Sequence, residues 1–394
     1  MSLGATSRGT HLDDAVFDRP PSPAEPSISS TLWKYPGVAV LDTRGLNRAL
    51  LERQHLLRRS DIGVAKMIEH LVGMQSQVPE APYVGLWSRL DPFDPNELGH
   101  LMERRRAVRL TLMRMTLHLV TRRDCLRLRP IFQPMIETTA VRTDAGLRVA
   151  GVDRAALVAA GRAMLEAEPL TRAALGKRLS ERFPGYDPVS LASVVVWSLP
   201  ALQVTPRGVW KRTGRPTWAP IETWLGRPLP AKVDLDTLVL RYLDAFGPAT
   251  VADAHAWSRL NGLREVFERL RPKLRTYRDE DGRELFDAAD RTLPDPATPA
   301  PPRFLAEYDN VLIAHRDRRR VFVDDRRRII GTPTVLIDGF VRATWKIAVK
   351  KGAATLTITP VGSAKIGEDV VEEGRRLLEL REPDAEYDVQ VRES

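Results

Sequence analysis

The order of apolar and polar positions repeats itself three times along the chain. In each repeat, stretches with the helical spacing of apolar residues are followed by a pair of stretches whose β-branched and apolar residues suggest strands. The clearest repeat covers residues 231–293, where Asn261-Gly262 separates two helical stretches and Asp281-Gly282 is a strong hairpin signal. Two helices, a tight turn, a third helix and a two-stranded wing form the order of a winged helix-turn-helix module. The pattern therefore predicts an α+β fold with tandem modules of this kind.

The other two repeats follow the same order. The first covers residues 37–150, with four expected helices and then one or two strands: a helix from Thr43, a helix capped by Asp61, a helix around 83–87, a helix over 96–105 and the strands within 108–120. The second covers residues 151–230, with helices expected over 153–168, 171–183 and 187–197 and strands on either side of a turn at 212–214.

The two ends of the chain differ from the repeats. Residues 1–36 are rich in Ser, Pro, Gly and Asp and show no apolar period, so we expect a disordered tail. A proline-rich linker over 294–302 introduces a β-rich C-terminal segment at 294–394. That segment is predicted to contain strands and a final helix, at 311–314, 320–323, 333–337, 340–345, 354–359 and 368–380.

The amino-acid composition indicates the cellular compartment and the kind of partner that the chain binds. The chain has 394 residues and a net charge of +9, and ten of its 60 basic residues are lysine, the rest being arginine. Arginine binds phosphate through two parallel hydrogen bonds, so this bias favours a polyanionic partner. A dispersed, solvated surface explains the same charge equally well. No apolar run approaches the roughly 18 to 20 residues that a membrane crossing needs, and no signal peptide is evident, so we expect a cytoplasmic monomer.

The cysteine and histidine content argues against metal chemistry. The single cysteine, Cys125, rules out an internal disulfide and a cysteine-rich metal site. The seven histidines show no paired spacing of the kind that binds zinc. We therefore expect no metal and no cofactor.

The most informative stretch is Gly73-Met-Gln-Ser-Gln-Val-Pro79. Pro79 favours an extended backbone before it, and in an extended segment Gln75 and Gln77 project to the same side. Two neutral amides can hold a water and turn their carbonyl dipoles toward a developing cation, but they are not strong bases. The alternative is that both glutamines only cap the end of a helix.

Several runs in unbroken order resemble one family. The run Leu71-Val-Gly-Met-Gln-Ser-Gln-Val-Pro-Glu-Ala-Pro-Tyr-Val-Gly-Leu-Trp87 is similar to the signature of the winged-helix DNA glycosylases of the AlkZ and YcaQ type. Further similar runs follow at 112–120, 208–212, 223–228, 307–315 and 339–345. The resemblance implies tandem winged helices around a C-shaped basic channel, and excision of N-alkylated purines from double-stranded DNA without a cofactor.

The resemblance also assigns the glutamines. The family's catalytic motif is glutamine, a hydrophobic residue, then glutamine or aspartate. Gln75 and Gln77 match the branch with two glutamines, whose members include enzymes that unhook interstrand crosslinks made by bifunctional natural products. Ser76 departs from the hydrophobic middle position, and its side chain is expected to point away from both glutamines.

The implied chemistry agrees with two neutral amides. A purine alkylated at N7 is positively charged and leaves as a neutral base, while the sugar passes through an oxocarbenium-like state. Lys66 lies upstream of the motif, so a Schiff base is not expected and simple hydrolysis is favoured over strand cleavage. We expect an open channel for bulky adducts. His118 is a candidate supporting residue, with Arg114 and Thr116 expected at alternating strand positions on its face; a purely structural histidine is the alternative.

A basic run is the candidate DNA contact. His315 and the four arginines after it are expected to bind DNA, with the run at a hairpin tip, and a solvated turn is the alternative; the arginines are Arg316, Arg318, Arg319 and Arg320. Two other classes of function remain open from the residues alone. One is a winged-helix regulator without catalysis, and the other is a protein that sequesters the alkylating agent.

Overall fold

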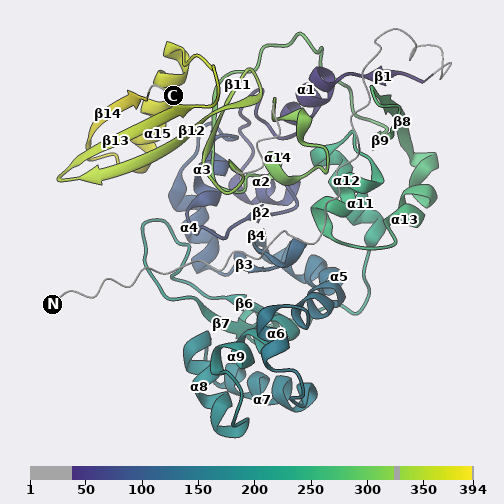
Figure 1. Ribbon diagram of the computed structural model, residues 1–394, viewed down its shortest axis with the longest axis vertical. Helices are drawn as coiled ribbons and strands as arrows, with labels where there is room; N and C mark the ends of the chain where they lie inside the picture. The colour runs from purple at the N-terminus through teal and green to yellow at the C-terminus, as the bar shows by residue number, and fades with distance from the viewer. Residues whose placement is uncertain (1–37, 324–328, 393–394) are drawn as a thin grey trace. The chain divides into compact units, whose positions relative to one another are not determined.

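The computed structural model describes residues 38–323 and 329–392, and Figure 1 shows their elements. The expected tail at 1–36 lies outside the described residues. The described chain is α+β: helices pack around a six-stranded, a five-stranded and a three-stranded sheet. By its internal contacts, the part from Val38 onward is one compact unit.

The six-stranded sheet joins the first two repeats. Its strands, in the order in which they pair, are β2 (Met74–Gln75), β4 (Leu117–Thr121), β3 (Ala107–Thr111), β6 (Ala201–Gln203), β7 (Thr217–Pro220) and β5 (Leu170–Thr171). The two strand pairs predicted from the sequence are antiparallel pairs, as expected. They are not separate, however, because Arg109 on β3 pairs with Gln203 on β6. The short strand β2, which carries Gln75, forms one edge of this sheet.

The helices of the first repeat surround β2. They are α1 (Thr43–Arg53), α2 (Val64–His70), α3 (Ala81–Trp87) and α4 (Pro95–Glu103), with the 3-10 turn η2 (Met113–Met115) between β3 and β4. Helix α3 is in contact with β2, and α2 with β4. The prediction that Asp61 caps the second helix is wrong: α2 begins after Gly63, and Asp61 is exposed. The amide of Val64 instead donates to the Glu97 side chain at 3.1 Å, so a carboxylate from α4 satisfies the helix end.

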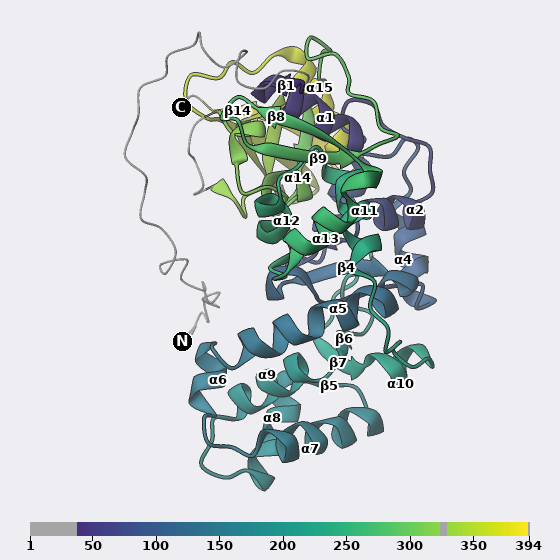
Figure 2. The same cartoon turned by 90° about the vertical axis from the view of Figure 1, so that its right-hand side faces the viewer.

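The second repeat contains a buried helical core. The helices α7 (Arg154–Ala167), α8 (Arg172–Arg182) and α9 (Pro188–Ser198) begin after the predicted caps Asp153, Thr171 and Asp187, whose side chains accept from backbone amides. The apolar helix α9 is almost wholly buried by its neighbours (Figure 2). Two of those neighbours were not predicted: α5 (Arg122–Ala140), which contains two prolines, and α6 (Asp144–Arg148).

The third repeat follows its prediction closely. After the short helix α10 (Ile221–Leu225) come α11 (Leu235–Phe246), α12 (Val251–Ser258), α13 (Leu263–Leu270), the 3-10 turn η3 (Arg271–Lys273) and the antiparallel hairpin of β8 (Leu274–Asp279) and β9 (Glu284–Ala288). The start of the first repeat joins this group. The strand β1 (Val40–Leu41) pairs parallel with β8, and α1 contacts α11 (Figure 2).

The C-terminal segment is β-rich, as predicted, and α15 (Glu368–Arg381) lies against its sheet (Figure 1). The strands are β10 (Arg303–Leu305), β11 (Thr334–Ile337), β12 (Phe340–Lys350), β13 (Ala353–Pro360) and β14 (Glu386–Val391). Strands β10 and β14 were not predicted. The strands expected at 311–314 and 320–323 are wrong. Helix α14 (Asn310–Ile313), capped by Asp309, occupies most of the first stretch. The 3-10 turn η4 (Arg318–Arg320), capped by Asp317, ends where the second stretch begins, and Phe322 in that stretch makes an isolated bridge with Val341 instead of a strand.

Candidate active site

The segment with the two glutamines is extended as predicted only at its start: β2 covers Met74–Gln75, and the chain bends at Gln77 and Val78. Gly73, at a φ of +95°, turns the chain from α2 into β2, and a Cβ there would lie 2.7 Å from Val120 Cγ1. Gln75 then pairs with His118 on β4, and the Ser76 amide donates to the Leu117 carbonyl at 2.7 Å. The sheet therefore fixes the backbone of the motif through its second residue.

The side chains of Gln75 and Gln77 are both held through their carbonyls. Gln75 is 7% exposed, and its Oε1 accepts from Arg114 Nη2 at 2.8 Å. Gln77 is exposed, and its Oε1 accepts from the Leu117 amide at 2.9 Å. Ser76 is fully buried and contacts Arg109, so it points away from Gln75 as expected. Because an amide oxygen has two acceptor positions, each glutamine keeps one for a water.

Arg114 and Thr116 do not lie on a strand, contrary to the prediction, and Thr116 instead follows the turn η2 directly before β4. The position of Arg114 matters most. Arg114 belongs to the turn η2, with a left-handed φ of 54°. From this turn its guanidinium reaches both Gln75 and the backbone carbonyl of Trp257 at the end of α12. Burial, reinforced by the charges of Arg259 and Arg318, lowers the pKa of Arg114 to about 9. The guanidinium is thus a charged donor at neutral pH that joins the motif to the third repeat.

His118 supports Arg114 and is electrically neutral. Its Nδ1 lies 3.0 Å from the Thr116 carbonyl, so this nitrogen carries the proton, and its Nε2 lies 3.5 Å from Arg114 Nη2. Burial, followed by the charge of Arg114, lowers the pKa of His118 to about 3. The hydroxyl of Thr116 donates to the Met113 carbonyl at 3.0 Å and closes the turn. These contacts agree with a structural role for both residues.

The basic run at 315–320 is not a hairpin tip. His315 is 4% exposed and lies 2.9 Å from the Phe246 carbonyl, and Arg320, also 4% exposed, donates to the Pro248 carbonyl at 2.5 Å. Neither side chain is available to a ligand in this structure. Arg316 is exposed, and Arg318 is half-buried. The expectation that all five side chains face DNA is therefore corrected for His315 and Arg320.

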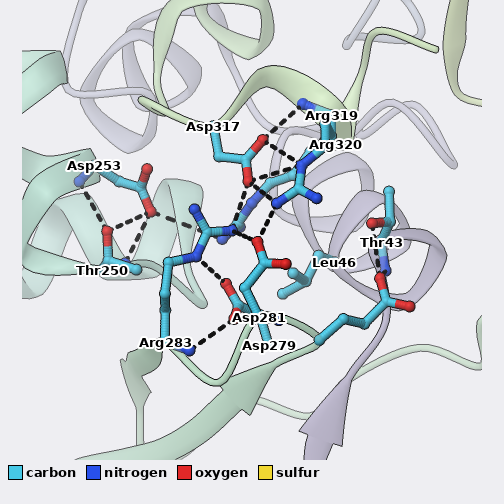
Figure 3. Close-up of a pocket in the computed structure, with 11 residues that line it drawn as sticks. Thr43, Leu46, Thr250, Asp253, Asp279, Asp281, Arg283, Asp317, Arg319 and Arg320 are labelled. Atoms are coloured by element: carbon cyan, nitrogen blue, oxygen red, sulfur yellow. Dashed lines mark hydrogen bonds and ion pairs between the residues drawn. The ribbon is translucent and has the colours of Figure 1, made fainter. Parts of the chain in front are cut away.

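Arg319 is exposed but engaged in a network of ion pairs (Figure 3). It pairs with Asp317 and Asp281, and Arg283 pairs with Asp317 at 2.5 Å and with Asp279 at 2.7 Å. Although burial favours the neutral acid, the hydrogen bonds from Arg319 and Arg283 hold the pKa of Asp317 well below its usual range. The network ties the β8–β9 turn to η4 and lines a small polar pocket (Figure 3).

Comparison with known proteins identifies the family. The sequence pattern described as DNA glycosylase AlkZ-like matches residues 68–380, most of the described chain. The chain belongs to the AlkZ-like DNA glycosylase family. The structure of the Streptomyces sahachiroi DNA glycosylase AlkZ is similar to this one with a TM-score of 0.71 at 19% sequence identity, over 90% of this chain and 100% of that chain. The comparison with curated proteins found no match.

Membership of the AlkZ-like family implies DNA glycosylase activity and a DNA substrate. The matched region contains β2 with both glutamines, the turn η2 and the basic run. Within the described ranges, no helix has both the length and the apolar character to cross a membrane. No group of three or more candidate side chains in the same ranges is placed to hold a metal ion.

Sequence reasoning missed one residue at the motif of this AlkZ-like chain. Arg109 is 1% exposed and binds Ser76 from the far side of the sheet. A signal was present, because Arg109 stands between apolar residues at an inward position of the strand 107–111. A charged residue in such a place is rarely buried without a specific partner.

Proposed function

We propose that this chain is a monofunctional DNA glycosylase that hydrolyses the N-glycosidic bond of N7-alkylated purines in duplex DNA. Gln75 and Gln77 are the proposed catalytic residues. One observation carries the proposal: both side-chain carbonyls are fixed by donors from a single stretch, Arg114 and the Leu117 amide. Fixed dipoles of this kind favour a charged transition state without reorganising during the reaction.

The chemistry needs little more than a positioned water and a favourable field. The alkylated purine departs as a neutral base, so no strong acid is required. Each glutamine oxygen uses one acceptor position within the protein and offers the other to a proton of the attacking water. Neutral His118 cannot act as the acid at ordinary pH, because its pKa is about 3. The same hydrolysis at either end of an interstrand crosslink would unhook it, which extends the proposal to the adducts of bifunctional natural products.

We further propose that the repeats act as tandem winged-helix modules along a C-shaped basic channel. Modules that line such a channel would contact the phosphates of DNA, and contacts to phosphate do not depend on the base sequence. The third helices of two repeats bear on the alternative of a sequence-reading regulator. Most side chains of α9 are buried, and the exposed positions of α13 hold Glu265 and Glu268 beside two arginines. Carboxylates at these positions repel phosphate, which argues against a regulator that reads one duplex sequence through α13.

The proposal is tested by incubating the protein with duplex DNA that contains one N7-methylguanine. Release of the free base, with the sugar left as an abasic site and the strand uncut, is the expected result. A regulator would bind without releasing base, and a sequestering protein would bind the alkylating agent in the absence of DNA. Gln77→Ala is the matched variant, because it removes one carbonyl from an exposed position and leaves the core intact. Unchanged release by a folded Gln77→Ala protein contradicts the proposed site.

A further inference from the structure

A buried guanidinium lies directly behind the motif. Arg109 is 1% exposed, and all of its hydrogen bonds are to neutral groups. Among the described residues, no carboxylate lies within 4.0 Å of it; burial, and then the charge of Arg207, lowers its pKa to about 10. An unpaired buried charge is costly, so a position that retains one is a candidate for a specific task.

The contacts of Arg109 converge on the residue between the two glutamines. Nε donates to Ser76 Oγ at 2.8 Å, and Nη2 donates to the Ser76 carbonyl at 2.6 Å. The third contact, from Nη1 to Gln203 Oε1 at 3.0 Å, holds the far side of the guanidinium on β6. Arg109 therefore donates hydrogen bonds to both the side chain and the backbone of Ser76, and Gln203 on β6 holds the guanidinium in place.

The hydrogen bonds from Arg109 to Ser76 fix the orientation of the peptide after Ser76, which the pairing of β2 with β4 does not fix. The ladder between β2 and β4 ends with the Ser76 amide. Within the described part of the chain, Arg109 is therefore the one hydrogen-bond donor to the carbonyl of the peptide that joins Ser76 to Gln77. Rotation of that peptide would move the Gln77 backbone. The side-chain carbonyl of Gln77 would then lose its hydrogen bond from the Leu117 amide. A small misplacement of a group that must meet a transition state is enough to lower a rate strongly.

We infer that Arg109 is a positioning residue of the active site, which acts through Ser76 to fix the direction of Gln77. The inference rests on the proposed function, because it concerns the same two glutamines. Arg109 pairs with Leu119 and Gln75 pairs with His118, so these two side chains leave the sheet on opposite faces. The side-chain hydrogen bonds of Arg109 go to Ser76 and Gln203 and to neither of the two glutamines of the motif. Its effect is thus expected on the rate of excision and not on the affinity for DNA.

The test measures single-turnover release of N7-methylguanine, duplex affinity and melting temperature for one set of full-length variants. Arg109→Met removes all three hydrogen bonds. Arg109→Lys keeps the positive charge but lacks the planar guanidinium that donates to both the hydroxyl and the carbonyl of Ser76. Ser76→Ala removes only the hydroxyl contact and is the mildest change. The control is Arg129→Met, since Arg129 is also fully buried and bound to backbone carbonyls and Gln133, and it does not touch residues 74–77.

The expected results separate positioning from folding. Release by Arg109→Met should fall by about 10- to 100-fold, as for a misplaced catalytic group, with duplex affinity within about twofold. Ser76→Ala should lose about three- to tenfold, the worth of one ordinary hydrogen bond, because the contact of Arg109 with the Ser76 carbonyl remains. Arg109→Lys should fall between wild type and Arg109→Met. Arg129→Met should lower the melting temperature and leave the rate of release unchanged at a temperature well below melting.

Two outcomes overturn the inference in different ways. If Gln77→Ala loses activity while folded Arg109→Met and Ser76→Ala release base at the wild-type rate, the glutamine site stands and Arg109 has no positioning role. If Gln77→Ala releases base normally, the proposed site fails, and the role of Arg109 fails with it. If Arg109→Met does not fold, the rate of Ser76→Ala decides by itself, because an unchanged rate with that contact removed contradicts the inference.

Discussion

Nη2 of Arg114 donates to Oε1 of Gln75 at 2.8 Å, across 39 positions of sequence. The contact places a half-buried cation beside a proposed catalytic amide. A positive charge opposes an oxocarbenium-like state, so the benefit of Arg114 must lie in its geometry, which outweighs its field. The same guanidinium also binds the Trp257 carbonyl, so Gln75 is oriented from the third repeat as well as from its own strand.

Changing Arg114 should therefore reveal two opposing effects. Arg114→Met removes the donor that orients Gln75, and release of N7-methylguanine should fall by about tenfold, near the loss of one charged hydrogen bond. Arg114→Lys should retain part of the activity because one donor remains. Single-turnover release at fixed DNA saturation measures this. An Arg114→Met protein that is faster than wild type would show that the field of the cation dominates.

The two glutamines should behave as one unit. Replacing Gln77 by alanine removes an acceptor for the attacking water, so release should fall by about ten- to a thousand-fold, the range for one electrostatic contact to a transition state. Gln75→Ala should act similarly. The double variant should lose less than the product of the single losses, because both oxygens hold one water. Excision rates of the four proteins measure this, and strictly multiplicative losses would mean that the residues act independently. Circular dichroism verifies that each variant is folded.

The sequence predicted local structure well where caps and turns carry the signal. Helices begin after Asp153, Thr171 and Asp187 as expected. It made no prediction for α5, whose Pro130 and Pro134 are unfavourable inside a helix but are accommodated by tertiary packing. The apolar run at 311–314 was read as a strand, although a four-residue helix occupies most of it.

The candidate site was predicted only in part, for a physical reason. Extended backbone at Met74–Gln75 and the side-chain alternation there follow from Pro79 and could be read locally. The partners of the motif could not, because Arg109 and Arg114 reach it through the pairing of β2 with β4 and β4 with β3. His315 and Arg320 show the same limit. Their charge suggested a surface, but a carbonyl acceptor for each and the buried Asp253 hold them inside.

Acid should destabilise the protein through its buried histidines. Burial lowers the pKa of His118 to about 3, and of His315 to about 3, whereas a histidine in the unfolded chain has a pKa of about 6.5. Below that value the unfolded state binds a proton that the folded state does not, so stability should fall as the pH drops from about 7 to 5. Each such histidine contributes a slope of up to about 1.4 kcal/mol per pH unit.

Urea unfolding at several pH values between 5 and 7 measures this slope. The window lies above the range in which carboxylates take up protons, so the histidines dominate. His118→Gln keeps a polar side chain without a titrating group and should reduce the slope relative to wild type. An identical slope in that variant would show that His118 is protonated in both states or in neither.

The last prediction separates two neighbouring arginines by their partners. Arg316 is exposed, and its guanidinium has no ion pair with a described residue, whereas exposed Arg319 is already paired with Asp317 and Asp281. A guanidinium gains most from a DNA phosphate when it does not have to leave a carboxylate. Arg316→Ala should therefore weaken binding to every duplex sequence alike and reduce the slope of log affinity against log salt by about one, the effect of one lost phosphate contact. Arg319→Ala should change that slope little and should instead loosen the contact between η4 and the β8–β9 turn.

Fluorescence anisotropy with two unrelated duplexes across a range of salt concentrations measures both variants. A larger loss for Arg319→Ala than for Arg316→Ala would mean that the ion-pair network opens when DNA binds, and a loss confined to one duplex would contradict binding through phosphates.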